Sequence, residues 1–330
     1  MPRFDIAPQA ESTRVNRSFH WPEVDCVVVN RDGGESLFAA LRSLKEQVGI
    51  DLSILVVDNG SSAAERQRLS REVPEVRVLP FPRNLGFAGA ANEGIARTRA
   101  PFVLLVNNDA VLAGDYVVRL AARLALDGRL AAAQGLVLSA DGDRIDTAGL
   151  EWNGRGEAVP VLGGAAAQNP PRVVFEVSGV SATATLYRRV ALDAVSSANE
   201  VFDRAFFAYY EDVDLSLRLA RGGWRFICDP AARARHEGSR TGRRTPLRRA
   251  LWTARNRWRT LFRHFDGGLL ARRLGPLLQA DLAHARQLGW RGAILPLLVW
   301  PALPLLAWRR RNLGGLLSEW PTPEVLGDKT

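Results

Sequence analysis

Residues 102–109 read FVLLVNND, and this short stretch is the clearest indication of the fold class. Five apolar residues follow one another without alternation and stop at two amides and a carboxylate. A continuous apolar run is typical of a strand buried on both faces, as in a parallel sheet. Val24–Val29 and Leu52–Val57 repeat the pattern, and Ser36–Gln47 between them has leucines at helical spacing. We therefore predict an α/β fold with a doubly wound, mainly parallel sheet and right-handed crossovers.

The alternation of apolar runs and helical patterns continues along the chain. Further predicted strands are Val76–Leu79, Ala131–Leu138, Val173–Ser178, Ala182–Tyr187 and Arg225–Cys228. Predicted helices are Ala63–Glu72, Phe87–Arg99, Asp115–Leu126, Asp212–Arg221 and a basic helix from Pro246 to His264. Residues 140–172 are rich in Gly, Ala and Pro, and we expect them to form a long surface excursion.

This pattern predicts three parts of the chain. Residues 1–22 are polar and aperiodic and predict a flexible tail. Residues 23–240 carry the strand and helix pattern and predict one domain. Residues 241–330 predict a basic, helical C-terminal appendage.

Composition excludes disordered, fibrous and disulfide-stapled proteins, because 47% of the 330 residues are hydrophobic and 24% are charged. Cys26 and Cys228 lie in apolar runs, so we expect buried free thiols in a reducing compartment. The N-terminus lacks the order of regions that marks a signal peptide, and we expect none.

The positive charge is concentrated in the last quarter. From Arg240 onward there are 17 Lys and Arg residues and 5 acidic ones, a balance of +12 that leaves −3 for residues 1–239. Nearly all the cations are arginines, which form bidentate bonds to phosphate. This favours a polyanionic partner, and the alternative is a solvated basic face.

Residues 292–308 contain no charge. A helix of that length reaches about 25 Å, short of a hydrocarbon core of about 30 Å, and Pro296, Pro301 and Pro304 would interrupt it. Arginines and tryptophans flank the segment, as is usual at the headgroup level. We expect a re-entrant or interfacial membrane segment, and the alternative is a buried helical hairpin.

Three polar clusters follow predicted strands, where ligands of open α/β sheets gather. They begin at Asn30, Asp58 and Asn107. Asp58 can accept hydrogen bonds from a nucleobase or ribose, or it can form an Asx turn. Asp109 can hold a divalent cation that bridges a diphosphate, or it can cap the next helix.

Three further stretches carry reactive or binding side chains. Residues 83–92 join a strand to a helix, and their glycines and Arg83 suit phosphate, although the spacing is no dinucleotide fingerprint. Residues 209–214, YYEDVD, place three carboxylates at a helix start, either as caps or as a general base. His236 follows, and it is either structural or a metal ligand.

These clusters, in this order, resemble the inverting glycosyltransferases of family 2, which have the GT-A fold, and most closely the bacterial rhamnosyltransferase-like branch that builds cell-surface polysaccharides. The resemblance covers about residues 23–265. It is carried by residues 27–34, 56–62, 83–92, 105–109, 206–218 and 236–239. It implies that 23–110 is the nucleotide half and 111–240 the acceptor half.

The resemblance also implies roles for individual residues. Asp212 would be the catalytic base, with Glu211 beside it, and Asp109 and His236 would hold Mg²⁺ or Mn²⁺. The donor would contact Asn30, Asp58, Arg83, Asn84, Gly86, Asn92, Asn107 and Asn108. The acceptor side would include Ser178, Gly179 and Tyr210. Asn107 departs from the acid that opens the family's D-x-D motif, and Asp214 is expected to be structural, capping its helix or pairing with an arginine.

The implied reaction is a single displacement. Asp212 would deprotonate an acceptor hydroxyl, which would attack the anomeric carbon of a nucleoside-diphosphate sugar and expel the diphosphate beside the cation. The resemblance suggests rhamnose or a similar sugar, passed to a glycan or to a polyprenyl-diphosphate-linked acceptor. We expect a cytoplasmic enzyme, peripheral on the inner face of the cell membrane and drawn there by anionic lipid.

Other functions stay open at this point. A nucleotidyltransferase or a dehydrogenase can use a similar sheet, although the glycine pattern of the latter is absent. A non-catalytic nucleotide-sugar-binding module would tolerate Asn107. The basic helix could bind nucleic acid, but we expect no such partner.

Overall fold

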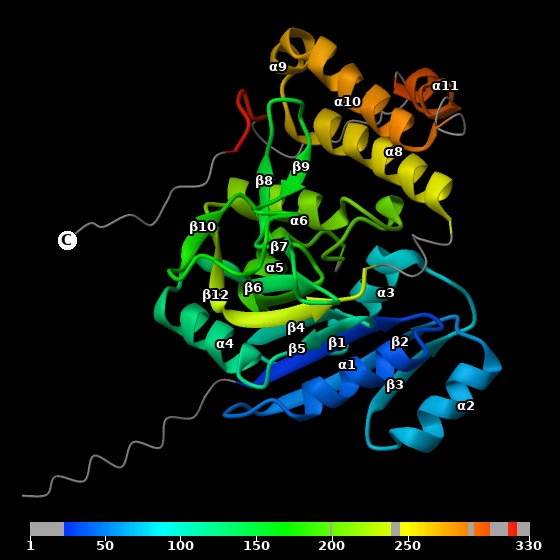
Figure 1. The fold of residues 1–330 in the computed structure, drawn as a ribbon, viewed down its shortest axis with the longest axis vertical. Helices are drawn as coiled ribbons and strands as arrows, with labels where there is room; N and C mark the ends of the chain where they lie inside the picture. Colours follow the sequence, from blue (N-terminus) through cyan, green and yellow to red (C-terminus); the bar gives the residue numbers. More distant parts are fainter. Residues whose placement is uncertain (1–22, 199, 239–244, 290–293, 304–315, 322–330) are drawn as a thin grey trace, which may run out of the picture.

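A computed structural model describes residues 23–198, 200–238, 245–289, 294–303 and 316–321. Its centre is a single large sheet with the strand order β10-β12-β6-β11-β4-β1-β2-β3, joined by β5 beside β12 and β7 beside β6 (Figure 1). The strands of the first half are β1 (Val24–Asn30), β2 (Leu52–Asn59), β3 (Arg77–Phe81) and β4 (Phe102–Asn107). Those of the second half are β5 (Ala110–Leu112), β6 (Leu130–Ser139), β7 (Ile145–Thr147), β10 (Phe175–Val177), β11 (Ala184–Arg188) and β12 (Arg225–His236).

The sheet is mainly parallel, as predicted. β1 pairs in parallel with β2 and β4, β2 with β3, and β6 with β12. Four strands run against this direction: β11 lies antiparallel between β4 and β6, β10 and β5 lie antiparallel to β12, and β7 lies antiparallel to β6. In this register Asn30 stands beside Asp58, so the polar clusters that end β1 and β2 meet at one edge.

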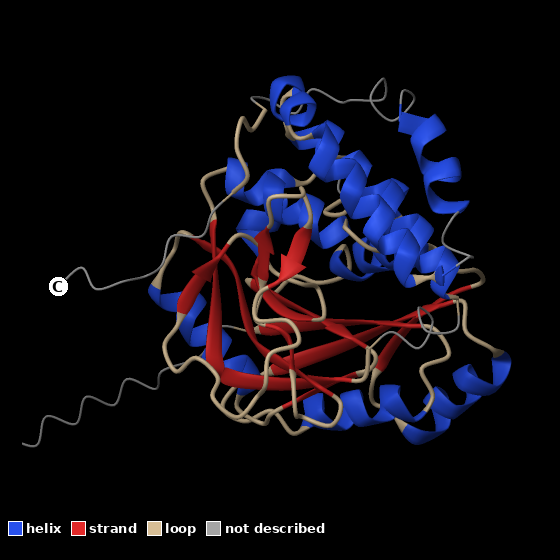
Figure 2. Ribbon diagram, turned by 45° about the horizontal axis from the view of Figure 1, so that its top comes forward, coloured by secondary structure: helices blue, strands red, loops and turns tan. Residues whose placement is uncertain are grey.

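Helices cover both faces of the sheet (Figure 2). One buried cluster joins α1 (Glu35–Lys45), α2 (Ala63–Glu72) and α4 (Tyr116–Leu126) to β1 through Val24, Cys26 and Val28. The other joins α3 (Gly86–Ile95), α5 (Arg189–Val195) and α6 (Glu211–Arg221) to the opposite face. Because helices bury both faces of the sheet, its strands have continuous apolar runs, which explains the pattern in the sequence.

The fold differs from the predicted elements in two places. Residues 140–172, expected to form a long surface excursion, contain β7 and a small hairpin, β8 (Leu150–Trp152) with β9 (Ala158–Pro160), which the sequence analysis did not predict. The last strand was predicted to end at Cys228, but β12 continues to His236 across irregular pairing between Asp229 and Arg233. Its outer half has alternating exposure, and pairing with β5 and β6 supports it where the sequence is too polar to indicate a strand.

The C-terminal region forms a layer of helices over the second half of the domain (Figure 1). Its elements are α8 (Pro246–His264), α9 (Gly267–Arg272), α10 (Leu274–Gln287), α11 (Ile294–Val299) and the single turn η3 (Trp300–Ala302). Leu261 and Phe265 are fully buried here, in one cluster with Phe206 and Val213 of the second half. The appendage therefore shares a hydrophobic core with α6.

The basic helix α8 does not present all of its arginines to solvent. Arg257 is fully buried and donates to Asp281 of α10 at 2.8 Å, and Trp258 and Trp300 donate to the other carboxylate oxygen. Burying this charge is tolerable only because the carboxylate and backbone carbonyls satisfy it. A uniformly solvated basic face was thus the wrong interpretation for this part of α8, and only the cations near its start are exposed.

The apolar segment at 292–308 is described only in its middle, at residues 294–303. There Val299 is buried and Trp300 packs against the helices, while Pro301 is exposed. Within the described ranges, every helix is too short or too polar to cross a bilayer.

Cys26 and Cys228 are both buried and unbridged, which confirms the prediction of buried free thiols.

Candidate active site

The first part of the site is the edge where β1 and β4 end. Asn30 is fully buried, and its side-chain oxygen accepts hydrogen bonds from the Asn108 amide at 2.7 Å and from the Gly33 backbone at 3.2 Å. Asn107, the last residue of β4, binds the backbone of Thr183. The predicted donor residues Asn30, Asn107 and Asn108 are therefore brought together.

Asp58, at the end of β2, forms the turn that was one of its two predicted uses, and its second oxygen is left without a hydrogen-bond partner. Oδ1 accepts from the Ser61 backbone at 3.0 Å, which closes a turn. Oδ2 is buried without a hydrogen bond, and its nearest cation is Nη1 of Arg66 at 3.8 Å. A buried carboxylate oxygen left in this state costs free energy, and a ligand donor would relieve it.

The loop after β3 depends on a residue that the sequence analysis missed. Asn59 donates to Oδ1 of Asn84 at 3.0 Å and to the Gly86 carbonyl, and it accepts from the Leu85 backbone. Asn84 also accepts from the backbone of Gly86, so its described contacts shape the turn. Gly86 has a φ of +76°, and a Cβ there would lie 2.4 Å from the Phe207 carbonyl oxygen. Arg83 is exposed beside this turn.

Asn92 of α3 ties the two halves of the domain together. Its amide donates to the Phe202 carbonyl at 2.7 Å and its oxygen accepts from the Phe202 backbone at 2.8 Å. Both polar atoms of this side chain are thus engaged with protein, although its role as a donor ligand stays a prediction.

Asp109 and His236 lie together, as predicted, although 127 positions separate them in the chain. His236 Nε2 is 3.2 Å from Asp109 Oδ1, and its Nδ1 is 2.8 Å from Asp146 Oδ2. Burial alone would lower the pKa of His236, but the two carboxylates outweigh it and raise the pKa to about 9. Asp146 was missed because it stands in a stretch with no pattern of its own, and it lies beside a hollow of about 600 Å³.

The donor set of Asp109 and His236 suits a divalent cation that a substrate completes. One carboxylate and one imidazole are too few to enclose an ion, and the described residues hold no group of three or more candidate ligands. Mg²⁺ sites often use one or two carboxylates together with substrate phosphates. The carboxylate of Asp146 on the far ring nitrogen is the usual support for a metal-binding histidine.

The acidic pair starts α6. Asp212 is half-buried, and its carboxylate accepts from the backbones of Val213 at 2.9 Å and Ala182 at 3.3 Å. Burial raises the pKa of Asp212 despite these bonds. Glu211 is buried, its Oε2 has no hydrogen bond, and burial with the nearby Asp212 charge raises its pKa further.

The acidic pair and the end of β4 lie close together. The Ala182 backbone donates to Asp212, and the carbonyl of the next residue, Thr183, accepts from the Asn107 backbone at 2.9 Å. Two hydrogen bonds, through the adjacent residues Ala182 and Thr183, therefore connect Asp212 to Asn107, in the segment that carries Asp109. This proximity of distant motifs is what the resemblance requires.

Of the predicted acceptor residues, Gly179 packs against α6 one turn beyond Asp212. A Cβ on Gly179 would lie 2.8 Å from Ser216 of α6, so glycine permits close packing there. Ser178 donates to the Pro321 carbonyl at 3.2 Å. Tyr210 is buried in the core shared with the C-terminal helices.

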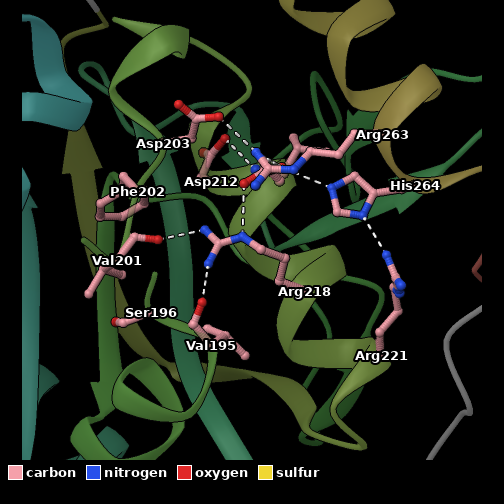
Figure 3. Close-up of polar contacts among 12 residues, drawn as sticks. Val195, Ser196, Val201, Phe202, Asp203, Asp212, Arg218, Arg221, Arg263 and His264 are labelled. Carbon is pink, nitrogen blue, oxygen red and sulfur yellow. Dashed lines mark hydrogen bonds and ion pairs between the residues drawn. The ribbon is translucent and has the colours of Figure 1, made fainter. Parts of the chain in front are cut away.

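Asp214 is structural, as expected. It is fully buried and contacts Arg218 at 2.9 Å, His264 at 2.8 Å and Arg263 at 3.1 Å. Burial alone would raise the pKa of Asp214, but these partners hold it well below its usual range. Figure 3 shows Arg218 and Arg263 between α6, α8 and the loop at Val201–Asp203. This network joins the helix of the acidic pair to the C-terminal layer.

The chain is similar in sequence to known glycosyltransferases. Residues 25–195 match the family model described as Glycosyl transferase family 2. An N-acetylglucosaminyl-diphospho-decaprenol L-rhamnosyltransferase of Mycobacterium tuberculosis is 30% identical over 245 residues, 67% of this chain and 78% of the relative.

Solved structures share the GT-A fold. The mannosyltransferase PcManGT from Pyrobaculum calidifontis, in complex with GDP-Man and Mn²⁺, gives a TM-score of 0.55 at 17% identity, over 88% of this chain and 80% of that chain. GalNAc-T7 with UDP, GalNAc and Mn²⁺ gives a TM-score of 0.56 at 14% identity, over 75% of this chain and 49% of that chain. At these identities the likeness concerns the fold alone.

Proposed function

We propose that this chain moves rhamnose or a similar sugar from a nucleoside diphosphate to a hydroxyl of a lipid-linked glycan. The chain belongs to glycosyltransferase family 2 and is a glycosyltransferase. Family membership excludes the dehydrogenase and nucleotidyltransferase alternatives. The identity of the sugar and of the acceptor is supported by the mycobacterial rhamnosyltransferase, whose name specifies a diphospho-decaprenol acceptor.

The donor would bind at the edge formed by β1, β2 and β4. Asp58 Oδ2, buried and without a hydrogen bond, would accept a donor group from the nucleobase or ribose. The exposed guanidinium of Arg83 would contact a diphosphate oxygen. Asn107 and Asn108 would border the sugar-diphosphate at the end of β4.

A divalent cation would be held by Asp109 and His236. When bound, such an ion supplies positive charge that stabilises the departing diphosphate. Asp146 would keep Nδ1 of His236 occupied, so that Nε2 faces the cation beside Asp109.

Asp212 would be the base. Its partial exposure gives an acceptor hydroxyl access to the carboxylate, whereas Glu211 is buried. A pKa raised by burial makes this carboxylate more basic than one in water, which favours proton removal from a hydroxyl. The hydroxyl would then attack the anomeric carbon as the diphosphate leaves, and the configuration would invert. The short path from Asp212 through Ala182 and Thr183 to Asn107 is the observation that carries this proposal.

The decisive experiment is a transfer assay with defined substrates. A panel of dTDP-, UDP- and GDP-sugars is first screened with Mn²⁺ by thermal shift, since a ligand at 100 times its Kd adds about 2.7 kcal/mol of stability. The best donor is then incubated with a polyprenyl-diphosphate-linked N-acetylglucosamine, and the product anomer is determined by NMR. Retention of configuration, or no transfer with any donor, would reject the proposal.

The start of α8 favours an anionic partner at the membrane. Arg248 and Arg249 are exposed, and their guanidinium groups stack over Trp252 and Tyr209 at 5.0 and 5.6 Å. Residues 246–264 contain no acidic residue. We propose that these cations draw the enzyme to anionic lipid on the inner face of the cell membrane, where a polyprenyl-linked acceptor would be presented.

A further inference from the structure

Asn256, in the middle of α8, makes an unusual set of contacts for a residue outside the family's motifs. It is fully buried, and its side-chain nitrogen lies 2.8, 2.9 and 2.8 Å from the carbonyl oxygens of Phe206, Ala208 and Tyr209. Its side-chain oxygen accepts from Nε and Nη2 of Arg255 at 3.0 and 2.9 Å. Because Arg255 can only donate, the oxygen is fixed on that side and the NH₂ group must face the carbonyls.

The loop that Asn256 contacts has a backbone that needs support. Phe207, Tyr209 and Tyr210 have φ values of 65°, 69° and 68°, a left-handed region that bulky residues rarely adopt. Tyr210 is the N-cap of α6 and offers no side-chain cap. A conformation of this kind persists only where surrounding contacts impose it. The carbonyl contacts of Asn256 are such a restraint.

The same loop touches both sides of the site. Glu211 and Asp212 follow it directly, so its path sets where the acidic pair begins. Its Phe207 carbonyl accepts from the Ala88 backbone at 3.2 Å and lies against Gly86, at the start of α3 on the donor side. Movement of the loop would therefore change the distance between the acidic pair and the donor.

We propose that Asn256 is a positioning residue, which fixes the loop at 206–210 and thereby holds Asp212 in place against the donor. The inference rests on the proposed role of Asp212 as base, and it makes the C-terminal helix α8 part of the catalytic apparatus. Asn256 touches no substrate in this arrangement and acts only through the loop.

The test compares Asn256→Asp with Thr260→Val. Aspartate has the same size but cannot donate, so it would turn oxygens toward three carbonyls. Thr260 is one turn further along α8, is equally buried, and has no hydrogen bond from its hydroxyl, so valine controls for a buried polar-to-apolar change on the same helix. Hydrogen exchange is followed by mass spectrometry on peptides that cover 205–212, and kcat and KM are measured for donor and acceptor.

For Asn256→Asp we expect exchange at 205–212 to accelerate at least about tenfold, while peptides from α1 and β1 keep their rates. We expect kcat to fall about 100-fold, the loss that a displacement of about 1 Å can cause, with the donor KM changed less than about threefold. Thr260→Val should behave as wild type in both measurements. Asn256→Ala, which brings no charge, is measured in the same way if the aspartate variant does not fold.

Each result bears on the inference. Unchanged exchange at 205–212 in a folded variant would show that Asn256 does not hold the loop. Faster exchange with wild-type kcat would show that the loop does not position the base. If wild type transfers no sugar from any donor, the proposed function fails, while the exchange measurement still decides whether Asn256 restrains the loop.

Discussion

The proposed active site has two regions that are stabilised in different ways: the donor edge, where β1, β2 and β4 end, and the acidic loop, residues 206–210, which leads into Glu211 and Asp212. At the donor edge, Asn30 binds Asn108 and Asp58 binds Ser61, so the side chains support one another at the ends of paired strands. The loop before Asp212 has strained backbone and depends on Asn256 of α8. The first region is held by the sheet that it terminates, and the second by a helix that follows it in the chain.

This difference suggests that the two halves of the site can be damaged separately. Changes at the acidic loop should reduce the chemical step or the stability of the C-terminal layer while nucleotide-sugar binding survives. Changes at the donor edge or at the Asp109–His236 pair should affect donor or cation affinity.

The largest effect is expected from Asp212→Asn. Loss of a general base costs about 10²- to 10⁴-fold, and the nucleotide-sugar Kd should stay unchanged because the donor edge is stabilised independently. Turnover and donor binding by calorimetry are compared with Asp193→Asn, an exposed carboxylate on α5. Because burial raises the pKa of Asp212, the acidic limb of the wild-type kcat profile should lie above the ordinary aspartate pKa. Parallel loss of donor binding would mean that Asp212 is structural.

Asp214→Asn should instead reduce stability. It removes the carboxylate between buried Arg218, Arg263 and His264, and breaking a buried ion pair costs about 3–5 kcal/mol. The native pKa of Asp214 is depressed, so its stabilisation is present above the unfolded pKa of about 3.9 and is lost as the pH falls below it. Urea unfolding at pH 7 and at pH 2.5, below the unfolded pKa, should show a gap in unfolding free energy between wild type and variant that narrows at the lower pH. An equal gap at both would contradict the assignment.

Asp146→Ala tests the support of His236. Loss of a carboxylate behind a metal-binding histidine typically lowers metal affinity 10- to 100-fold. Mn²⁺ binding in the presence of the donor is measured by calorimetry, with Asp143→Ala, an exposed neighbour, as the control. Wild-type Mn²⁺ affinity in Asp146→Ala would show that Asp146 does not support His236, and full activity of the wild type in excess chelator would remove the metal role.

The smallest effect is expected at the surface of α8. Arg248→Gln with Arg249→Gln should weaken binding to phosphatidylserine vesicles by less than about 2 kcal/mol, since each cation near the surface contributes about 1 kcal/mol that salt screens. Arg272→Gln with Arg273→Gln removes the same charge from exposed positions around the end of α9 and should leave binding unchanged. Substitutions are preferred to truncation after His264, because Phe265, Leu269 and Leu277 belong to the shared core and their loss would disrupt it. If both double variants lost vesicle binding equally, the net charge of the protein would account for the attraction, and the start of α8 would have no special role.

The amino-acid sequence by itself determined the parallel sheet and the donor edge. Continuous apolar runs reflect burial on both faces, and polar residues directly after strands must meet at one edge when the strands are parallel. Asp58, Asn107 and Asp109 were therefore predictable as neighbours before any coordinates. The outer half of β12 was not predictable from the sequence, because it is polar and is a strand only through its pairing with β5 and β6.

Only the tertiary structure decided which distant residues support the site. Asp146, Asn256 and Asp281 stand in segments whose local pattern indicates nothing about their partners, and each acts on an element at least 23 positions away. Hydrogen bonds of this kind form where packing brings two surfaces together, so no periodicity in the chain records them. For the same reason the arginines of α8 looked alike in the sequence, although Arg257 is buried against Asp281 and Arg248 faces solvent.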